Sequence, residues 1–277
     1  MNITAADVNK LRQQTGAGMM DCKKALVEAE GDFEKAVEVL RKAGQKVAAK
    51  RADNETSEGI VLVNVSEDGS SAKVLALACE TEPVSNVEDF KNLAAAVLAA
   101  GVKHDAKDTE TLLAIKMEDG ETVQEHITHL IGKIGEKVIV SDYVHVDGEK
   151  VVVYIHSNKK AAGIVSFGNV GGAEVEEVGR DISMQIVAMK PVALAKDDVD
   201  PSVIEKEIEI GKDQARQEGK PEAILEKIAM GKLEKFFKEN TLLSQQFVKD
   251  PSINIEQLLE QTQKGLTINS FKRIQIG

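Results

Sequence analysis

The sequence predicts an α+β fold made of a small helical domain, a core in which strands and a helix occur twice, and a helical hairpin. Apolar residues recur at helical spacing through the first fifty residues. From Gly59 they alternate with a period of two, which is typical of strands. Two charged segments between residues 201 and 240 return to helical spacing. Because helices and strands are grouped instead of alternating one by one, the order favours the α+β class.

The first fifty residues predict three short helices. The first ends before Gly16, the second runs from Met19 to Gly31, and the third follows the capping residue Asp32 and ends near Gly44. Each helix carries a narrow apolar stripe. Such stripes are buried only if the helices pack against one another, so we expect a three-helix domain with a small core.

Residues 46–58 are polar and alanine-bearing, and we expect a mixture of helical extension and linker there. Valine-rich runs flank an Asp-Gly turn at residues 68–69, which predicts a hairpin. Helical periodicity then returns twice before the midpoint of the chain. The predicted elements of this half are strands at 59–65 and 73–79 and helices at 88–100 and 123–134.

The same order of strands followed by a helix recurs in the second half, which suggests a duplicated unit. The predicted elements are strands at 138–146, 151–157 and 162–168 and a helix at 175–189. The alternating run at 271–276 is expected to add a strand to the sheet of this half. We therefore divide the chain into an N-terminal three-helix domain, two core subdomains, a hairpin and a return segment that completes the second subdomain, with bounds 1–50, 51–140, 141–200, 201–240 and 241–277.

Two charged helices form the hairpin. Residues 202–218 and 222–239 flank the turn Gly219-Lys220-Pro221, and about 17 helical residues span about 25 Å. An antiparallel coiled-coil pair buries one narrow seam and leaves its charged faces in water. The hairpin is either a structural arm or a projection that touches a partner, and the residues alone leave both readings open.

Composition and charge exclude several functional classes. The chain has 35 Lys and Arg against 46 Asp and Glu, a formal charge of −11, so it lacks the dense positive surface that non-specific nucleic-acid binding requires. Aromatic residues make up only 3%, which argues against stacking platforms for single strands. Apolar runs are too short to cross a membrane. The first residues lack a secretory pattern and the two cysteines form no framework, so we expect a cytoplasmic protein.

Enzymatic chemistry is poorly supported by the motifs. The Gly-Lys pairs lack the glycine spacing and the Ser or Thr of a phosphate-binding loop, and no nucleophile elbow occurs. His126 and His129 have a spacing that could ligate a metal, but no Glu lies between them and no Cys is near, so we interpret them as polar residues on a helix. We therefore expect no cofactor and no metal.

One string of residues is far more specific. Residues 11–26 read Leu-Arg-Gln-Gln-Thr-Gly-Ala-Gly-Met-Met-Asp-Cys-Lys-Lys-Ala-Leu and closely resemble the amino-terminal signature of the bacterial elongation factor Ts family. The resemblance extends over essentially the whole chain. Its further segments are Cys-Glu-Thr-Glu-Pro-Val at 79–84, Lys-Ile-Gly-Glu at 133–136, Tyr-Ile-His at 154–156, Gly-Lys-Pro at 219–221 and Gln-Phe-Val at 246–248.

The resemblance implies a guanine nucleotide exchange factor that is not itself an enzyme. The family binds the GDP-bound and nucleotide-free forms of the translational GTPase elongation factor Tu, and it disturbs the Mg²⁺ and phosphate site so that GDP leaves and GTP enters. It carries no nucleotide site and no cofactor, and it needs no direct contact with nucleic acid or membrane. Such exchange is catalysis by binding. Contacts that favour the nucleotide-free form of the partner lower the partner's affinity for its nucleotide by the same factor.

The resemblance also implies roles for particular residues. The small domain is expected to line the contact with the partner's GTPase domain through Leu11, Met19 and Met20. Ile134 and Gly135 are expected to back the loop that acts on the partner's Mg²⁺ site, and His156 to press on the partner near its phosphate loop. Those expected to form the loop that dislocates the partner's Mg²⁺ are Thr81, Glu82, Pro83 and Val84. The family usually has Thr-Asp-Phe-Val at this loop, so Pro83 replaces an aromatic ring, and proline cannot match the area that a ring buries.

Two other classes of function stay open at this point. The first is a ubiquitin-associated-like helical module fused to an interaction scaffold without exchange activity, since three-helix units bind many partners. The second is an enzyme of unknown chemistry. Release of labelled GDP from elongation factor Tu distinguishes the exchange factor from both.

Overall fold

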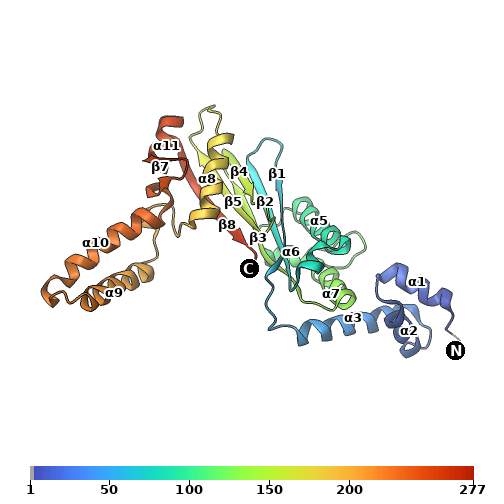
Figure 1. The fold of residues 1–277 in the computed structure, drawn as a ribbon. Coiled ribbons are helices and arrows are strands. Elements are labelled where there is room, and N and C mark those ends of the chain that lie inside the picture. The colour runs from blue at the N-terminus through green and yellow to red at the C-terminus, as the bar shows by residue number, and fades with distance from the viewer. Residues whose placement is uncertain (1–2) are drawn as a thin grey trace.

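The computed structural model describes residues 3–277, which form an elongated molecule with the small helical domain at one end and the helical hairpin at the other (Figure 1). Helices and small antiparallel sheets are combined, which confirms the predicted α+β class. The α-helices are α1 (Ala5–Thr15), α2 (Met19–Glu28), α3 (Phe33–Lys50), α4 (Glu82–Asn86), α5 (Glu88–Lys103), α6 (Thr109–Ala114), α7 (Val123–Ile134), α8 (Glu176–Met189), α9 (Pro201–Gln217), α10 (Glu222–Asn240) and α11 (Ile255–Thr262). The strands are β1 (Glu58–Val65), β2 (Ser71–Cys79), β3 (Val138–Asp147), β4 (Lys150–Ile155), β5 (Ala161–Gly168), β6 (Gln246–Phe247), β7 (Asp250–Asn254) and β8 (Thr267–Gln275).

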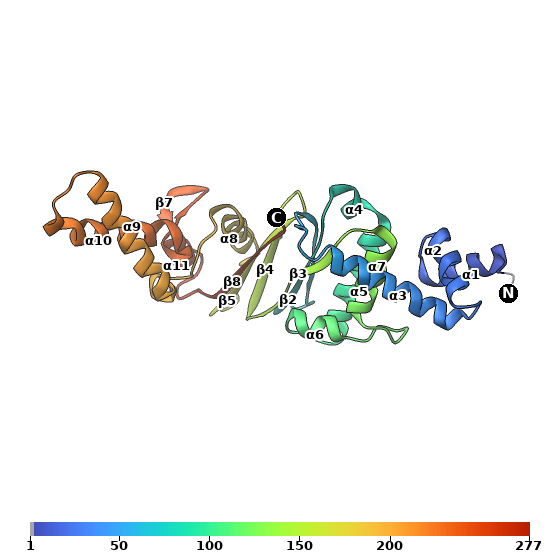
Figure 2. The same ribbon diagram turned by 90° about the horizontal axis from the view of Figure 1, so that it is seen from below.

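Helices α1–α3 pack around a small core of their own. Thr4 and Asp7 form a reciprocal capping box at the start of α1, and the Asp32 side chain accepts a hydrogen bond from the Lys35 backbone N–H at the start of α3. The buried side chains that the three helices share are Val8, Leu11, Cys22, Ala25, Leu26, Ala29 and Ala36. Figure 2 shows that this domain joins the rest of the molecule through α3, which lies along α7.

Gly44 does not end α3, contrary to the sequence prediction. The helix continues to Lys50, and Gly44 is the buried point at which it crosses α7. A Cβ at Gly44 would lie 2.7 Å from the backbone oxygen of Thr128 and 3.6 Å from the Cα of Gly132. The glycine therefore serves a close helix crossing instead of a helix stop, and the helical extension expected within residues 46–58 covers 46–50.

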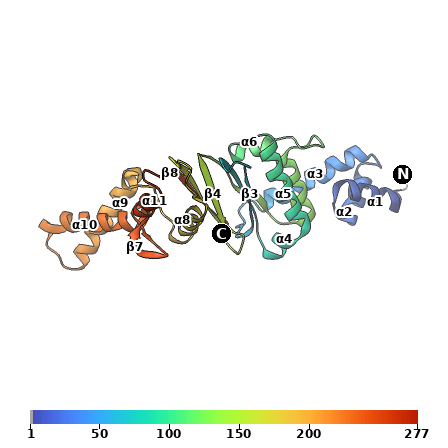
Figure 3. The same ribbon diagram turned by 90° about the horizontal axis from the view of Figure 1, so that it is seen from above.

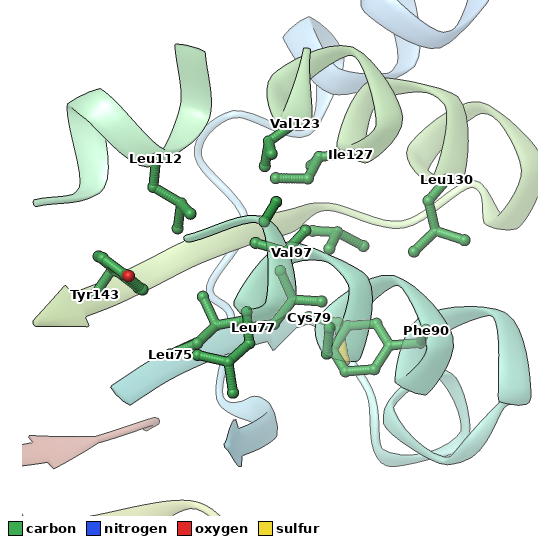
Figure 4. Close-up of a cluster of buried hydrophobic side chains, with 14 of the residues drawn as sticks. Leu75, Leu77, Cys79, Phe90, Val97, Leu112, Val123, Ile127, Leu130 and Tyr143 are labelled. Carbon is green, nitrogen blue, oxygen red and sulfur yellow. The ribbon is translucent and has the colours of Figure 1, made fainter. Parts of the chain in front are cut away.

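The first sheet has the order β1-β2-β3, all antiparallel, and α4–α7 cover one of its faces. Strand β2 is buried on both sides. Its odd-numbered residues point at the helices, and Figure 4 shows Leu75, Leu77 and Cys79 lying with Phe90 and Val97 of α5 in this apolar cluster. Helix α7 and β3 complete the same cluster with Val123, Ile127, Leu130 and Tyr143.

The second sheet has the order β4-β5-β8, and α8 packs on its outer face. Residues 271–276 were expected to add a strand here, and β8 does pair with β5. Strand β3, in contrast, pairs with β2 over Val138–Asp147. The boundary drawn between residues 140 and 141 therefore falls inside a strand of the first sheet, because hydrophobic alternation does not reveal which neighbour a strand pairs with.

The two sheets face each other across an apolar layer. The even-numbered residues of β2 point into it, and small side chains are frequent on both sides. Its buried members are Val61, Ala72, Val74, Ala76, Ala78, Val146, Val151, Ala162, Ile164, Ile274 and Ile276. The middle of the molecule is thus built of helices, a sheet, a second sheet and helices again, as Figure 3 shows from above.

Helices α9 and α10 form the predicted antiparallel hairpin, which projects away from the sheets (Figure 1). At its seam Gly211 lies directly against Ala229, where an added Cβ would approach the Ala229 Cα to 3.1 Å. Where the hairpin meets the core, Leu233 and Phe237 pack on Ala193 and Val199. The hairpin therefore has an apolar attachment at one end and a solvated body.

Candidate functional site

Strand β2 ends at a hydrogen-bonded junction centred on Glu80. Its carboxylate accepts hydrogen bonds from Arg51 Nη1 at 3.0 and 2.9 Å, from Asn54 Nδ2 at 2.8 Å and from the Lys137 backbone N–H at 2.6 Å. Burial opposes ionisation, but the bonds from Lys137, Asn54 and Arg51 outweigh it and hold the pKa of Glu80 below its ordinary value. Glu80 therefore ties together the linker after α3, the end of β2 and the start of β3.

The four residues predicted to be a loop follow this junction, and here the structure corrects the prediction. Thr81 is the residue before α4, and the other three are the first three of the five residues of that short helix. Glu82 and Pro83 are exposed, whereas Val84 is 7% exposed and packs into the helix-covered core. A proline in the first helical turn loses no hydrogen bond, which is why Pro83 is compatible with a helix here. Thr81, Glu82 and Pro83 of the expected set are therefore exposed to a partner, and Val84 is not.

Glu136 joins this helix to the end of α7. The Thr81 backbone N–H donates to Glu136 Oε2 at 3.2 Å and the Thr81 hydroxyl donates to Oε1 at 2.9 Å. Just before it, Gly135 caps α7 with a φ of +80°, a conformation that favours glycine, while Ile134 packs against the core. The structure thus brings the predicted segments 81–84 and 134–135 together, although they are far apart in sequence.

In the small domain the three expected contact residues have different environments. Met19 and Met20 begin α2 and are 55% and 64% exposed, so both are free to meet a partner. Leu11 is 0% exposed and lies in the core of the three helices. The expectation of a direct contact by Leu11 is therefore corrected, because its spacing on α1 directs it inward. The Arg41–Glu125 ion pair between α3 and α7 holds this domain against the core.

His156 lies in the turn between β4 and β5 and is exposed. Its Nδ1 is 3.1 Å from the Tyr154 hydroxyl, and its backbone N–H donates to the Ala161 carbonyl oxygen at 2.8 Å. The side chain borders a hollow of about 410 Å³ that is also lined by the cations of Lys160 and Arg273. This hollow gives the end of the two sheets a locally positive rim on an otherwise acidic protein.

The His156 turn and the α4 turn lie at the same end of the two sheets. Glu58 pairs with Cys79 in the β1–β2 register, one residue before the Glu80 junction. The Lys160 ammonium donates to Glu58 at 2.9 Å and so connects the β4–β5 turn to the same place. Helices α2 and α4 lie on one long side of the molecule (Figures 2 and 3). Met19, Glu82 and His156, which sequence reasoning assigned separately, thus belong to elements that one large partner surface can reach.

Neither of the two cysteines has a thiol that is activated by its surroundings. Burial, reinforced by the Glu136 carboxylate, raises the pKa of the Cys79 thiol to about 12, so this residue is not an activated nucleophile. Burial likewise raises the pKa of Cys22.

A separate cluster of Asp119, Glu121 and His126 has ligand atoms within 4.8 Å of one another and could hold a metal ion.

Sequence reasoning missed the residues that hold the site in place. Glu80 and Glu136 lie inside the distinctive segments 79–84 and 133–136, but nothing in their spacing indicates that they accept hydrogen bonds from other parts of the chain. A carboxylate directly after a buried strand is the one signal that could have pointed to Glu80. Its partner Arg51 comes from the linker, where the sequence shows no pattern at all.

Within residues 3–277 no helix is long and apolar enough to cross a bilayer.

The family model described as Elongation factor TS matches residues 80–277. Elongation factor Ts of Cytophaga hutchinsonii is 62% identical over 99% of this chain and 99% of its own length. The proteins of the same name from Amoebophilus asiaticus and Porphyromonas gingivalis are 48% and 44% identical, over 100% of this chain and 100% and 99% of their own lengths. The similarity includes the three-helix domain as well as the core and the hairpin, which disfavours an unrelated scaffold. The chain therefore belongs to the elongation factor Ts family of translation elongation factors.

Proposed function

We propose that this chain is the guanine nucleotide exchange factor of elongation factor Tu and acts through three surfaces: the start of α2, the start of α4 and the His156 turn. It binds the GDP-bound partner, disturbs the partner's Mg²⁺ and phosphate site, and stays bound to the nucleotide-free form until GTP enters. The observation that carries the proposal is the braced turn at Thr81, where Glu82 and Pro83 are exposed on a rigid support. The chemistry requires shaped contacts and no acid–base groups.

The energetic requirement is set by linkage. If the complex weakens GDP binding by a given factor, GDP weakens the complex by the same factor. Each tenfold change in GDP affinity takes about 1.4 kcal/mol of difference between the contacts made in the two states. In a flexible loop, part of this free-energy difference would be offset by the conformational entropy lost when the loop becomes ordered on binding. Here the hydrogen bonds to Glu136 and Glu80 order the α4 turn before the partner binds.

Some of these residues bind the partner, and others disturb its Mg²⁺ and phosphate site. Met19 and Met20 supply exposed, adaptable apolar area for the GTPase domain. Glu82 supplies a carboxylate that competes for the Mg²⁺ site, and Pro83 fixes the shape of the turn where relatives of this family carry an aromatic ring. Ile134 and Gly135 support the α4 turn from behind, and His156 approaches the partner's phosphate loop.

Three finer assignments belong to the same proposal. The N-terminal helices form a ubiquitin-associated-like unit, supported by their three-helix packing. The two halves of the core derive from one duplicated unit, supported by a three-stranded antiparallel sheet with a covering helix in each. The factor works in the cytoplasm with elongation factor Tu as its partner, and direct binding to nucleic acid or membrane is not part of its action.

Stopped-flow release of labelled GDP from elongation factor Tu tests the proposal. Glu82→Ala should slow release at saturating factor while changing the affinity of the complex less, because α2 and the His156 turn still bind. Met20→Ala should mainly weaken the complex. Glu67→Ala is the matched control, since this carboxylate is also exposed but lies in the distant β1–β2 turn. Wild-type release by the Glu82 variant would refute the role of the α4 turn, and no acceleration by the unaltered chain would refute exchange altogether.

A further inference from the structure

Two carboxylate and two imidazole side chains gather where the segment between α6 and α7 enters α7. Asp119 and Glu121 come from a tight turn, and His126 and His129 come from the first turns of the helix. His126 Nε2 lies 3.1 Å from Asp119 Oδ2, and His129 Nδ1 lies 3.3 Å from Glu121 Oε2. Each imidazole thus faces one carboxylate.

The backbone holds these side chains together. Lys116 and Thr122 form an isolated antiparallel bridge, and the Met117 N–H donates to the Glu121 carbonyl oxygen at 2.8 Å. Gly120 closes the turn with a φ of +87°. The Thr122 hydroxyl then caps α7, so His126 follows the turn in fixed register. The cluster is therefore preorganised by main-chain contacts and by a helix cap.

The ligand atoms lie close enough together to share one metal ion. Zinc binds imidazole nitrogen and carboxylate oxygen at about 2.0–2.2 Å, which places neighbouring ligand atoms about 3.4 Å apart. The ligand atoms of Asp119, Glu121 and His126 all lie within 4.8 Å of one another, and the Asp119–His126 pair is already at 3.1 Å. We propose that these three residues bind one Zn²⁺ ion, with a water molecule as the fourth ligand.

His129 has a supporting place in this site. Its contact with Glu121 is of the kind by which an outer-shell residue orients a ligating carboxylate. The side chains of His126 and His129 are each 24% exposed, so neither is a freely rotating surface residue. A hollow of about 550 Å³ bordered by Asp119 and His126 leaves an entry path for the ion and room for the water ligand.

The ligand types favour zinc over the harder divalent cations. Ca²⁺ and Mg²⁺ prefer sets made entirely of oxygen, whereas an imidazole with two carboxylates suits Zn²⁺ and its neighbours among the transition metals. Bound there, the ion fastens the 116–122 turn to the N-terminal half of α7. The histidine spacing by itself gave no such indication, because the carboxylates come from before the helix and not from between the two histidines.

Zn²⁺ titration of the full-length, metal-stripped chain by calorimetry tests the site, with Co²⁺ absorption as the probe of geometry. We expect one ion per chain and the intense visible bands of tetrahedral Co²⁺. His126→Gln should lower Zn²⁺ affinity at least tenfold, and His129→Gln should lower it less. Glu118→Gln is the matched control, because this carboxylate is in the same turn but outside the ligand set, and it should leave affinity unchanged.

Three results would overturn the proposal. They are a Zn²⁺ affinity that His126→Gln leaves unaltered, a Co²⁺ spectrum identical to that of the hydrated ion, and a loss of affinity in Glu118→Gln equal to that in His126→Gln. Circular dichroism of each variant checks that it is folded. If His126→Gln were unfolded, Glu121→Gln would carry the same expectation, since it removes a ligand charge while keeping the side-chain size.

Discussion

Replacing Gly44 with alanine should destabilise the protein, although alanine is the better helix former. In an exposed helix interior the change from Gly to Ala is worth about 0.8–1.0 kcal/mol in favour of alanine. At Gly44, however, the new Cβ would lie 2.7 Å from the Thr128 backbone oxygen, which is closer than real contacts allow. Overpacking of this kind costs about 1–3 kcal/mol.

The upper part of that range applies because the obstructing atoms belong to the backbone of α7. A flexible side chain could rotate away, but the Thr128 oxygen and the Gly132 Cα move only if the two helices separate. We therefore expect a net loss of about 1–2 kcal/mol. For a chain of this size that corresponds to a fall of about 2–8 °C in Tm.

Gly231→Ala is the matched control, because Gly231 lies within α10 and a Cβ there would meet nothing within 4 Å. Gly231→Ala should gain most of the difference in helix propensity between glycine and alanine, and should therefore raise the free energy of unfolding by about 1 kcal/mol. Urea unfolding followed by circular dichroism measures both variants. A Gly44→Ala protein as stable as Gly231→Ala would refute the idea that α3 and α7 cross in close backbone contact.

Three further outcomes follow from burial and charge. Leu11→Ala should lower the stability of the small domain by about 2–5 kcal/mol, whereas Met20→Ala should stay within about 0.5 kcal/mol of wild type when both are measured by urea unfolding; equal effects would contradict the difference in burial between the two side chains. The Asp105 carboxylate accepts a hydrogen bond from Lys73, which lowers its pKa to about 2, so its contribution to stability is complete above pH 4 and is lost as the pH falls through about 2. Asp105→Asn should therefore be less stable than wild type at pH 7 and converge with it near pH 2 in acid titrations, and a gap that persisted at low pH would exclude this cause. The Cys79 thiol should resist a disulfide reagent at pH 8 until the chain is unfolded, because its pKa is about 12 and it is buried; rapid labelling of the native protein would show otherwise.

The regular part of the fold was predictable because its signals are local. Apolar stripes at helical spacing predict the main helices, and alternating apolar residues predict the main strands. The latter include the strand at 271–276, which pairs with β5. Pairing between strands depends on partners distant in sequence. For that reason the sequence places β3 in the second half, whereas the strand pairs with β2 of the first. The sequence likewise predicts a loop where α4 forms, because the five residues of α4 are too few to show a helical period.

The candidate site was predictable at the level of segments and less so at the level of side chains. The resemblance pointed to the segments around Met19, Thr81 and His156, all of which lie on exposed turns or helix starts. It could not tell that Leu11 faces inward, because a signature string includes residues that maintain the domain core together with those on its surface. Glu80 and Glu136 could not be predicted, because a hydrogen bond between residues distant in sequence produces no pattern in residue spacing.

The pairing of β5 with β8 has a consequence for how the protein is made. The nearest paired residues, Gly168 and Thr267, are 99 positions apart, and the hairpin of α9 and α10 is synthesised between them. During vectorial synthesis the small domain and the first sheet can close while the second sheet still lacks its third strand. Until Ile274 and Ile276 arrive, the layer between the sheets is incomplete and its apolar residues are open to water. The growing chain therefore passes through a stage at which an unpaired edge of β5 and a bare apolar face coexist, and this stage is the one at which aggregation competes with folding.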